Sequence, residues 1–231
     1  MGGNIAENAG GPQCLKKGVT GDSVLELEFV TADGAVHRMD RGGLDIPGVI
    51  IGSEGTLAFV TDAVLKLEPI PKFTRTAFAV FHDLGKAGRA VALVTARGLT
   101  PAKLELMDGS SIQAVEQFMK MGLPVDAEAL LVCDCDGDDL ETVTHEIESV
   151  EAAFREAGAT QVRLAATVDE AAQLWKARRS VSPALACTVG YSVSWVRRAM
   201  PANSWGRSQH HCSWLVPDCL EPCWQSSSAA G

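Results

Sequence analysis

The first residues whose types could do chemistry form a run rich in glycine and asparagine. Residues 2–11 read Gly-Gly-Asn-Ile-Ala-Glu-Asn-Ala-Gly-Gly, so two Gly-Gly pairs flank a small apolar centre. Backbone N–H groups that glycines leave uncovered can line a diphosphate, as in anion-binding nests. The short Asn side chains can bond a ligand or close turns. An ordinary Gly/Asn-rich loop is the alternative, and composition alone leaves both interpretations open.

A second run with the same character occupies residues 51–57, Ile-Gly-Ser-Glu-Gly-Thr-Leu. Two glycines bracket Ser53 and Glu54, so backbone and hydroxyl donors could face a ligand. A hairpin or a β-bulge is the alternative. Because 12 of the 22 glycines precede residue 56, we expect the first part of the chain to form a system of loops around a ligand.

Two other groups of polar residues resemble metal sites, but we predict that neither of them binds a metal. His210, His211 and Cys212, with Cys219 and Cys223, offer five soft ligands close together. Their spacings fit no common zinc template, so we expect no metal.

The acidic run Asp134–Asp139 resembles a calcium loop but lacks the Glu that an EF-hand places at its twelfth position. A strand end leading into an Asp-capped helix at Leu140 explains it better. His37, His82 and His145 occur singly, and we expect them at the surface.

The composition predicts a folded protein and limits its partners. Hydrophobic residues make up 46% of the 231 residues, which is too many for a disordered chain. The net charge of −9 argues against bulk nucleic-acid binding. No run of 18 apolar residues and no signal peptide is present, and the seven cysteines are an odd number. We therefore expect a cytoplasmic protein without disulfides or a transmembrane segment, with peripheral membrane attachment as an alternative.

Hydrophobic periodicity predicts alternating strands and helices over most of the chain. From residue 187 the pattern ends: the last 45 residues hold four of the five tryptophans and follow no period. We interpret this part as an irregular tail, from a reading-frame shift or a genuine extension. The expected strands are 24–30, 36–39, 48–52, 57–67, 73–81, 102–107, 129–135 and 161–166, and the expected helices are 84–97, 110–121, 140–157 and 168–179.

Taken together and in order, these runs resemble a known family. The series 2–11, 17–20 (Lys-Gly-Val-Thr), 24–30, 32–34 (Ala-Asp-Gly) and 51–57 is similar to the FAD-linked oxidases of the vanillyl-alcohol-oxidase type, whose FAD-binding domain is called PCMH-type. Within them it resembles the branch of glycolate oxidase GlcD and the D-lactate and D-2-hydroxyglutarate dehydrogenases. The resemblance spans roughly residues 1–186.

The resemblance implies an α+β fold, in which residues 1–72 form the second half of a PCMH-type FAD-binding domain. Residues 73–186 then form a partial ferredoxin-like FAD-linked oxidase C-terminal domain, and 187–231 the tail. The family's earlier glycine-rich loop would precede the chain, so FAD affinity should be low unless another chain completes the cradle. Ala58 stands where the family usually has Gly. The residues that the resemblance places beside FAD are Gly2, Gly3, Asn4, Asn8, Ala9, Gly10, Gly11, Gly18, Ser53, Glu54, Gly55 and Val60.

The resemblance also implies a substrate clamp and a reaction. Trp175 and Arg178 match a Trp-x-x-Arg pattern whose Arg clasps the substrate carboxylate, a task that suits a bidentate guanidinium. A solvated basic helix end is the alternative. The implied reaction is oxidation of a small 2-hydroxy acid, such as glycolate or D-lactate, by hydride transfer to flavin. We expect the chain to be a fragment of such an FAD-dependent oxidoreductase, with little or no turnover alone, and the sequence identifies no catalytic base. Other oxidase subunits are possible partners, and an inactive remnant that acts as an association domain is the rival interpretation.

Overall fold

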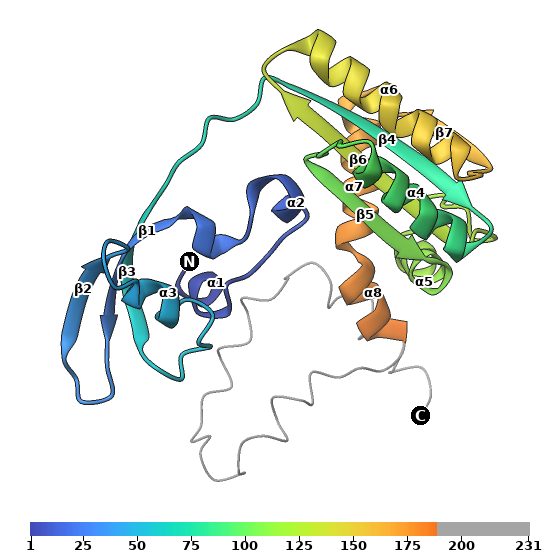
Figure 1. Ribbon diagram of the computed structural model, residues 1–231. Coiled ribbons are helices and arrows are strands. Elements are labelled where there is room, and N and C mark those ends of the chain that lie inside the picture. The colour runs from blue at the N-terminus through green and yellow to red at the C-terminus, as the bar shows by residue number, and fades with distance from the viewer. Residues whose placement is uncertain (189–231) are drawn as a thin grey trace, which may run out of the picture.

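The computed structural model describes residues 1–188, which form two groups of elements joined by an extended segment before Phe73 (Figure 1). The His and Cys residues of 210–223, for which we expect no metal, lie outside the described residues. Nearly all of the predicted irregular tail also lies outside them. Residues 187 and 188 of that tail continue a helix.

The N-terminal group is a small antiparallel sheet with short helices against it. The sheet order is β2-β1-β3, and β1 pairs with both neighbours. Its helices are α1 (Gly2–Glu7), α2 (Cys14–Lys17) and α3 (Ile46–Ile50), with a 3₁₀ turn at Thr20–Ser23, and its strands are β1 (Val24–Val30), β2 (Val36–Asp40) and β3 (Phe59–Leu65).

The alternating pattern of β1 decides which of its faces is buried. Leu27 and Phe29 are buried, whereas Glu26 and Glu28 on the other face lie beside Arg38 of β2. The three predicted extended segments at 24–30, 36–39 and 57–67 are therefore confirmed, the last of them shortened at both ends. The core of this group is small and consists of Ile5, Val24, Leu27, Phe29, Ile50 and Ala58.

Two expectations for this group are wrong. The run at 2–11 is not a loop throughout, because Gly2–Glu7 forms helix α1, with Ile5 buried against the sheet. The expected strand at 48–52 is instead helix α3, which the Asp45 side chain caps by accepting from the N–H of Gly48 at 2.9 Å. In both places tertiary packing of one isoleucine and a favourable helix end outweigh the low helix propensity of glycine.

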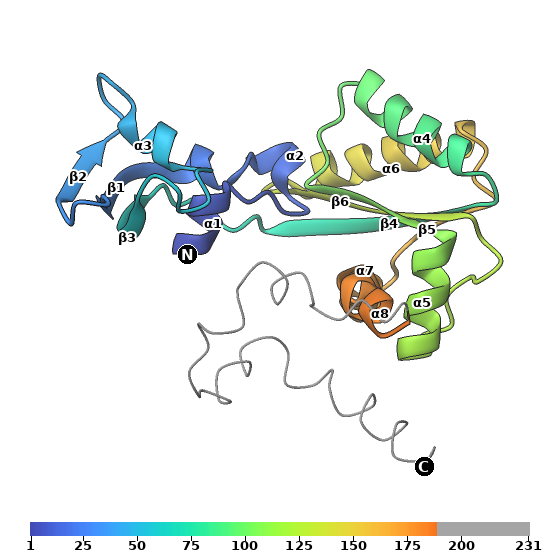
Figure 2. The same ribbon diagram turned by 90° about the horizontal axis from the view of Figure 1, so that it is seen from below.

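The C-terminal group is a four-stranded sheet between two layers of helices. The strand order is β5-β6-β4-β7, and every neighbouring pair is antiparallel. Figure 2 shows α4 and α6 on one face and α5, α7 and α8 on the other, each layer with its own buried cluster. The elements are β4 (Phe73–Phe81), α4 (Leu84–Ala96), β5 (Lys103–Asp108), α5 (Gly109–Met119), β6 (Ala129–Gly137), α6 (Leu140–Glu156), β7 (Gln161–Leu164), α7 (Val168–Arg179) and α8 (Val181–Thr188).

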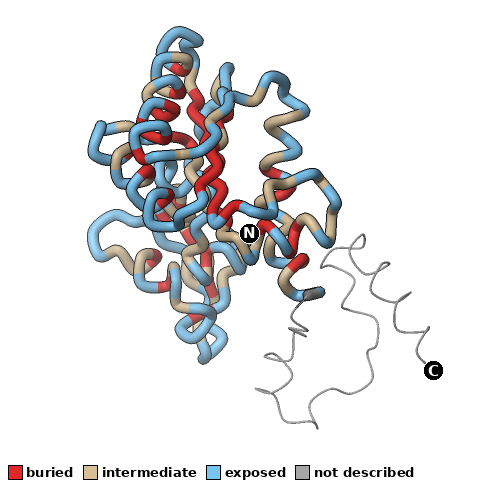
Figure 3. The backbone as a smooth tube through the Cα atoms, turned by 90° about the vertical axis from the view of Figure 1, so that its right-hand side faces the viewer, coloured by how far each residue is buried: buried red, intermediate tan, exposed pale blue. Residues whose placement is uncertain are grey.

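Apart from a few terminal residues, β4 to α7 agree with the predicted ranges, whereas helix α8 was not predicted. The predicted α+β class is confirmed. Buried residues follow the central strands of the sheet (Figure 3). Helices α4, α5, α6 and α7 each have an N-cap residue whose side chain accepts a hydrogen bond from a backbone N–H of the first turn. Those caps are Asp83, Asp108, Asp139 and Thr167.

The central strand β6 separates two kinds of side chain. Cys133 and Cys135 belong to the core below α4 and α6, and contact with the Cys135 thiol together with burial raises the pKa of Cys133. Asp134 and Asp136 alternate with them and therefore point to the other face. The acidic run 134–139 is thus the end of a strand followed by the Asp139 cap of α6, as the sequence predicted.

Candidate functional site

The two glycine-containing runs of the sequence meet in the N-terminal group. The N–H of Gly52 donates to the carbonyl of Ile5 at 3.0 Å, and the N–H of Glu54 donates to Ala6 at 2.8 Å. Gly2 lies next to β3, because a Cβ on it would be 3.6 Å from the carbonyl oxygen of Val60. The two runs that the sequence predicts to lie around one ligand are therefore neighbours.

The turn at residues 52–55 has the backbone strain that often marks a binding site. Gly52 and Gly55 have φ of 78° and 75°, which glycine adopts readily, but Glu54 has φ of 53°, which is unusual for a residue with a side chain. Between them, the Ser53 hydroxyl is buried and has no hydrogen-bond partner in the described part of the chain. Buried polar atoms are rarely left unsatisfied, so a ligand group is a natural partner for this oxygen.

The predicted glycines divide into two sets. Nothing lies within 4 Å of the position that a Cβ would take on Gly3, Gly11 or Gly55, so their backbone faces open space. A Cβ on Gly10 would instead lie 3.5 Å from the Val19 side chain, and one on Gly18, whose φ is 77°, would overlap the Asp22 side chain. The first set leaves backbone open to close approach by a ligand, whereas the second set shapes the turns of the chain.

Asn8 and Ala9 hold the next turn in place. Asn8 ends α1 in the left-handed conformation, and its Oδ1 accepts from the N–H of Gly21 at 2.7 Å. The carbonyl of Ala9 accepts from the N–H and the hydroxyl of Thr20 at 3.1 and 2.7 Å. Of the two roles open to the Asn side chains, Asn8 closes a turn, while Asn4 is exposed.

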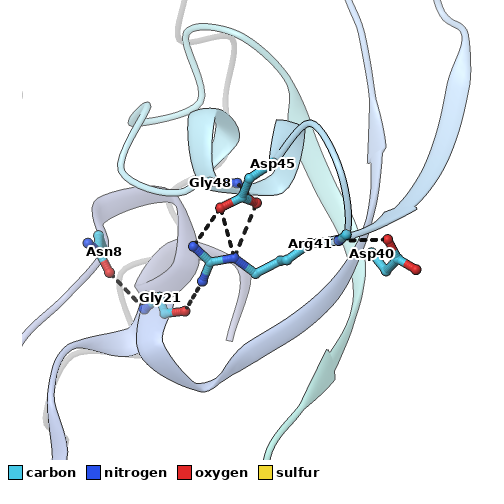
Figure 4. A network of polar contacts seen from close by, with 7 residues as sticks. Asn8, Gly21, Asp40, Arg41, Asp45 and Gly48 are labelled. Carbon is cyan, nitrogen blue, oxygen red and sulfur yellow. Dashed lines mark hydrogen bonds and ion pairs between the residues drawn. The ribbon is translucent and has the colours of Figure 1, made fainter.

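An arginine that the sequence analysis missed completes this support (Figure 4). The Nη1 of Arg41 donates to the carbonyl of Gly21 at 2.6 Å, and its Nη2 donates to Asp45 at 2.8 Å. Since the Gly21 N–H donates to Asn8 Oδ1, both backbone polar groups of Gly21 are held. The sequence Asp45-Ile46-Pro47 was an available signal, because a capping Asp followed by Pro in the first turn starts a helix.

This network predicts a stability that falls in acid. The Arg41 guanidinium, with help from the Gly48 N–H, lowers the pKa of Asp45 below its usual value. The stabilisation of the folded state by the Asp45 carboxylate is therefore complete above the unfolded-state pKa of Asp, about 3.9. It is lost as pH falls through the lower pKa that Asp45 has in the folded state. We expect Asp45→Asn to flatten the decline of unfolding free energy below about pH 4, measured by urea titration. An equal flattening by Asp40→Asn, which removes an exposed carboxylate outside the Arg41 pair, would contradict this role of Asp45.

A buried carboxylate docks α7 on the C-terminal sheet. Asp134 is 2% exposed and accepts from Trp175 Nε1, Thr76 Oγ1 and Lys103 Nζ at 2.8, 2.6 and 2.8 Å. Lys103 and Thr76 stand directly opposite Asp134 on the neighbouring strands. The Lys103 ammonium also lies 4.6 Å from the Trp175 ring centroid. Trp175 is therefore fixed in position and orientation.

Arg178 follows Trp175 by nearly one helical turn and is also held from the sheet. Its Nε and Nη2 both donate to Oε2 of Glu105, at 3.0 and 2.6 Å, and both side chains are half-buried. Arg178 is thus a positioned group and differs from the solvated helix end that was the alternative. Within residues 1–188 no acceptor contacts Nη1, so one edge of the guanidinium is available to an anion.

A separate pocket lies at the start of α5, away from the residues predicted to bind the cofactor and the substrate. Its volume is about 500 Å³ and it is widely open to solvent. Asp108, Asp126 and Glu128 line it, together with neutral residues, and none of the predicted site residues does. Three carboxylates make this pocket unsuitable for an anionic substrate.

Two protein families match the chain. The FAD linked oxidases, C-terminal domain, match residues 70–197, and the FAD binding domain family matches residues 1–40. The first match covers more than half of the chain and includes the Asp134 cluster and Arg178. The second includes the glycine run at 2–11.

Individual proteins show the same similarity. The chain is 42% identical over 190 residues to glycolate oxidase subunit GlcD of Escherichia coli K12, covering 80% of this chain and 38% of that protein. It is 29% identical to a D-lactate dehydrogenase of Anaerostipes hadrus over 80% of this chain and 42% of the relative. The chain therefore spans about two fifths of the length of these relatives.

Among solved structures, an alkyldihydroxyacetonephosphate synthase superposes with a TM-score of 0.61 at 20% identity. The superposition covers 80% of this chain and 36% of that one, and it shows a shared fold. Among the described helices, none is long and apolar enough to cross a membrane.

Proposed function

This chain belongs to the family of FAD-linked oxidases, and from that premise we propose that it serves in oxidising a small 2-hydroxy acid, such as glycolate or D-lactate, at bound FAD. The similarity to GlcD extends over both groups of elements. The observation that supports the proposal most is the meeting of the runs 2–11 and 52–55 at the Ser53 hydroxyl, which has no hydrogen-bond partner within residues 1–188.

The cofactor would lie against the N-terminal group. Ser53 offers a buried hydroxyl, and Gly3, Gly11 and Gly55 offer open backbone, which together fit a polar cofactor that needs close contact. Bound FAD supplies the acceptor for the hydride. The full set of residues proposed to surround it is Gly2, Gly3, Asn4, Asn8, Ala9, Gly10, Gly11, Gly18, Ser53, Glu54, Gly55 and Val60.

Arg178 is proposed to bind the substrate carboxylate. Glu105 takes the Nε edge of the guanidinium and leaves the other edge for a second carboxylate, so the side chain needs little reordering on binding. In the reaction, C2 of the acid loses a hydride and its hydroxyl loses a proton, which yields the 2-oxo acid. The contacts within residues 1–188 single out no base for that proton.

The proposal is tested by mixing the full chain with FAD without oxygen and adding glycolate or D-lactate. Loss of the visible flavin band shows substrate oxidation. Arg178→Met should raise the acid concentration for half-maximal bleaching by about tenfold or more, since a charge-assisted pair contributes about 1.5–3 kcal/mol. Arg179→Met, at the exposed neighbouring residue, should match the wild type.

Equal effects of the Arg178 and Arg179 substitutions would contradict the assigned clamp. A flavin band that neither acid bleaches would contradict the proposed reaction.

A further inference from the structure

We propose that the ion pair between Lys16 and Asp136 couples the FAD side of the molecule to the sheet that positions Arg178, so that cofactor and hydroxy acid bind cooperatively. Lys16 and Asp136 are thereby positioning residues. The inference rests on the proposed function, because it concerns how its two ligands are placed relative to each other.

The pair joins the two groups of elements across 120 residues of sequence. The Lys16 Nζ lies 2.5 Å from Asp136 Oδ1 and donates to the Asp136 carbonyl at 2.7 Å. The Asp136 side chain is only 5% exposed and that of Lys16 is 29% exposed. With two acceptors on one residue, the ammonium is fixed in place, unlike that of a surface lysine.

On the sheet side, Asp136 is part of the surface that places the clamp. It lies two residues after Asp134 on β6, so both carboxylates point to the same face. Asp134 holds Trp175, and α7 extends from there to Arg178. One short stretch of β6 therefore receives α7 through Asp134 and the N-terminal group through Asp136.

On the cofactor side, Lys16 lies in α2, directly after the glycine run. The N–H of Gly18 donates to Cys14 at 3.0 Å, and Thr20 is bonded to Ala9. The segment from Gly10 to Gly18, which contains Lys16, is therefore held at both ends, and Figure 2 shows α2 between the two groups. A shift of Lys16 would move the proposed FAD backbone at Gly10 and Gly11.

The neighbouring Lys17 provides a matched contrast. Its Nζ lies 2.6 Å from Glu68 Oε2, but those side chains are 37% and 43% exposed, and both partners belong to the N-terminal side and the connecting segment. Exposed pairs of this kind contribute little, whereas removal of Lys16 leaves the buried Asp136 carboxylate unpaired. Within residues 1–188, Lys16 pairs directly with Asp136 on β6, whereas Lys17 has only a weaker Coulombic interaction with that carboxylate.

Cooperative binding follows from this geometry. Hydride transfer requires the reacting atoms to approach within about 3–3.5 Å, so the clamp and the cofactor loop must be held in a fixed relation. FAD that orders the loop would then favour the clamp arrangement, and an acid on Arg178 would favour FAD binding by the same factor.

The experiment measures the FAD dissociation constant of the full chain by flavin fluorescence, with and without saturating oxalate. Oxalate is a two-carbon acid with no hydrogen to transfer. For the wild type and Lys17→Met we expect oxalate to tighten FAD binding by about five- to tenfold. For Lys16→Met the factor should fall below about twofold.

A double variant separates coupling from simple destabilisation. In Lys16→Met/Asp136→Asn no unpaired charge remains, so stability should recover relative to Lys16→Met while the oxalate effect stays lost. Recovery of the oxalate effect in the double variant, or its retention in Lys16→Met, would overturn the coupling. Wild-type FAD binding that oxalate does not change overturns the coupling and leaves FAD binding intact. No FAD binding at all overturns the proposed function as well.

Discussion

Asp134→Ala is expected to lower the free energy of unfolding by about 3–5 kcal/mol, the usual cost of removing one partner from a buried charged cluster. The substitution leaves the Lys103 ammonium, the Trp175 indole N–H and the Thr76 hydroxyl without their shared acceptor. Two of those donors belong to the sheet and one to α7, so the helix loses one of its two polar anchors on the sheet and keeps the Arg178–Glu105 pair. Urea unfolding followed by circular dichroism measures the loss.

Two further variants sharpen this test. Asp138→Ala removes a carboxylate from the same acidic run, but Asp138 is exposed, so we expect a change within about 0.5 kcal/mol. Trp175→Phe keeps a smaller aromatic ring but removes the indole N–H donor and some buried volume, so its cost should be about 1–3 kcal/mol. If Asp134→Ala and Asp138→Ala cost the same, Asp134 does not anchor α7.

Ile5→Ala should destabilise the N-terminal group by about 2–5 kcal/mol, as large-to-small substitutions in cores do. Ile5 is 1% exposed and is one of six buried residues in that core, so the loss is a large share of its apolar packing. Because Ile5 also accepts from Gly52, its displacement should open the proposed FAD site. Amide hydrogen exchange of β1 and β3 should accelerate, while that of β4 and β6 should not.

Leu15→Ala is the matched control for Ile5→Ala. Leu15 lies in the same N-terminal stretch but is 52% exposed, so its truncation should change exchange rates little. Uniform acceleration of exchange in both groups of elements after Ile5→Ala would show that the core of the N-terminal group is not a separate cooperative unit.

Hydrophobic periodicity was sufficient to predict most of the C-terminal group. Helix α6 has buried residues at Val143, Ile147, Val150 and Phe154, and this spacing allows only a helix with one apolar face. Lys103 and Glu105 are two residues apart on β5, so the sequence also predicts that their side chains lie on the same face of the strand. Long periodic segments are determined locally, which is why these elements agree with expectation.

The short helices α1 and α3 could not be predicted from the spacing of hydrophobic residues. Helix α1 has six residues and two glycines, and it forms because Ile5 packs under the sheet. Helix α3 has five residues, too few for a period to be read, and its capping signal at Asp45 was overlooked. Short segments take their conformation from tertiary contacts that a local pattern does not contain.

The polar partners of the site depend on the fold of the whole chain. The sequence singled out Arg178, but its partner Glu105 is 73 residues away, and Lys16 is 120 residues from Asp136. Strand register and helix placement bring these residues together. Ser53 was predicted from its place between two glycines, whereas the absence of a partner for its hydroxyl within residues 1–188 required coordinates.

FAD titration of the full chain, followed by flavin fluorescence, tests the central claim most directly. We expect saturable binding of one FAD, weakened by Gly55→Ala and unchanged by Gly34→Ala. Both glycines have positive φ and open space around a new Cβ, so the two substitutions introduce similar strain at different places. Absence of saturable binding, or equal effects of the two substitutions, would contradict a flavin site at the meeting of residues 2–11 and 52–55.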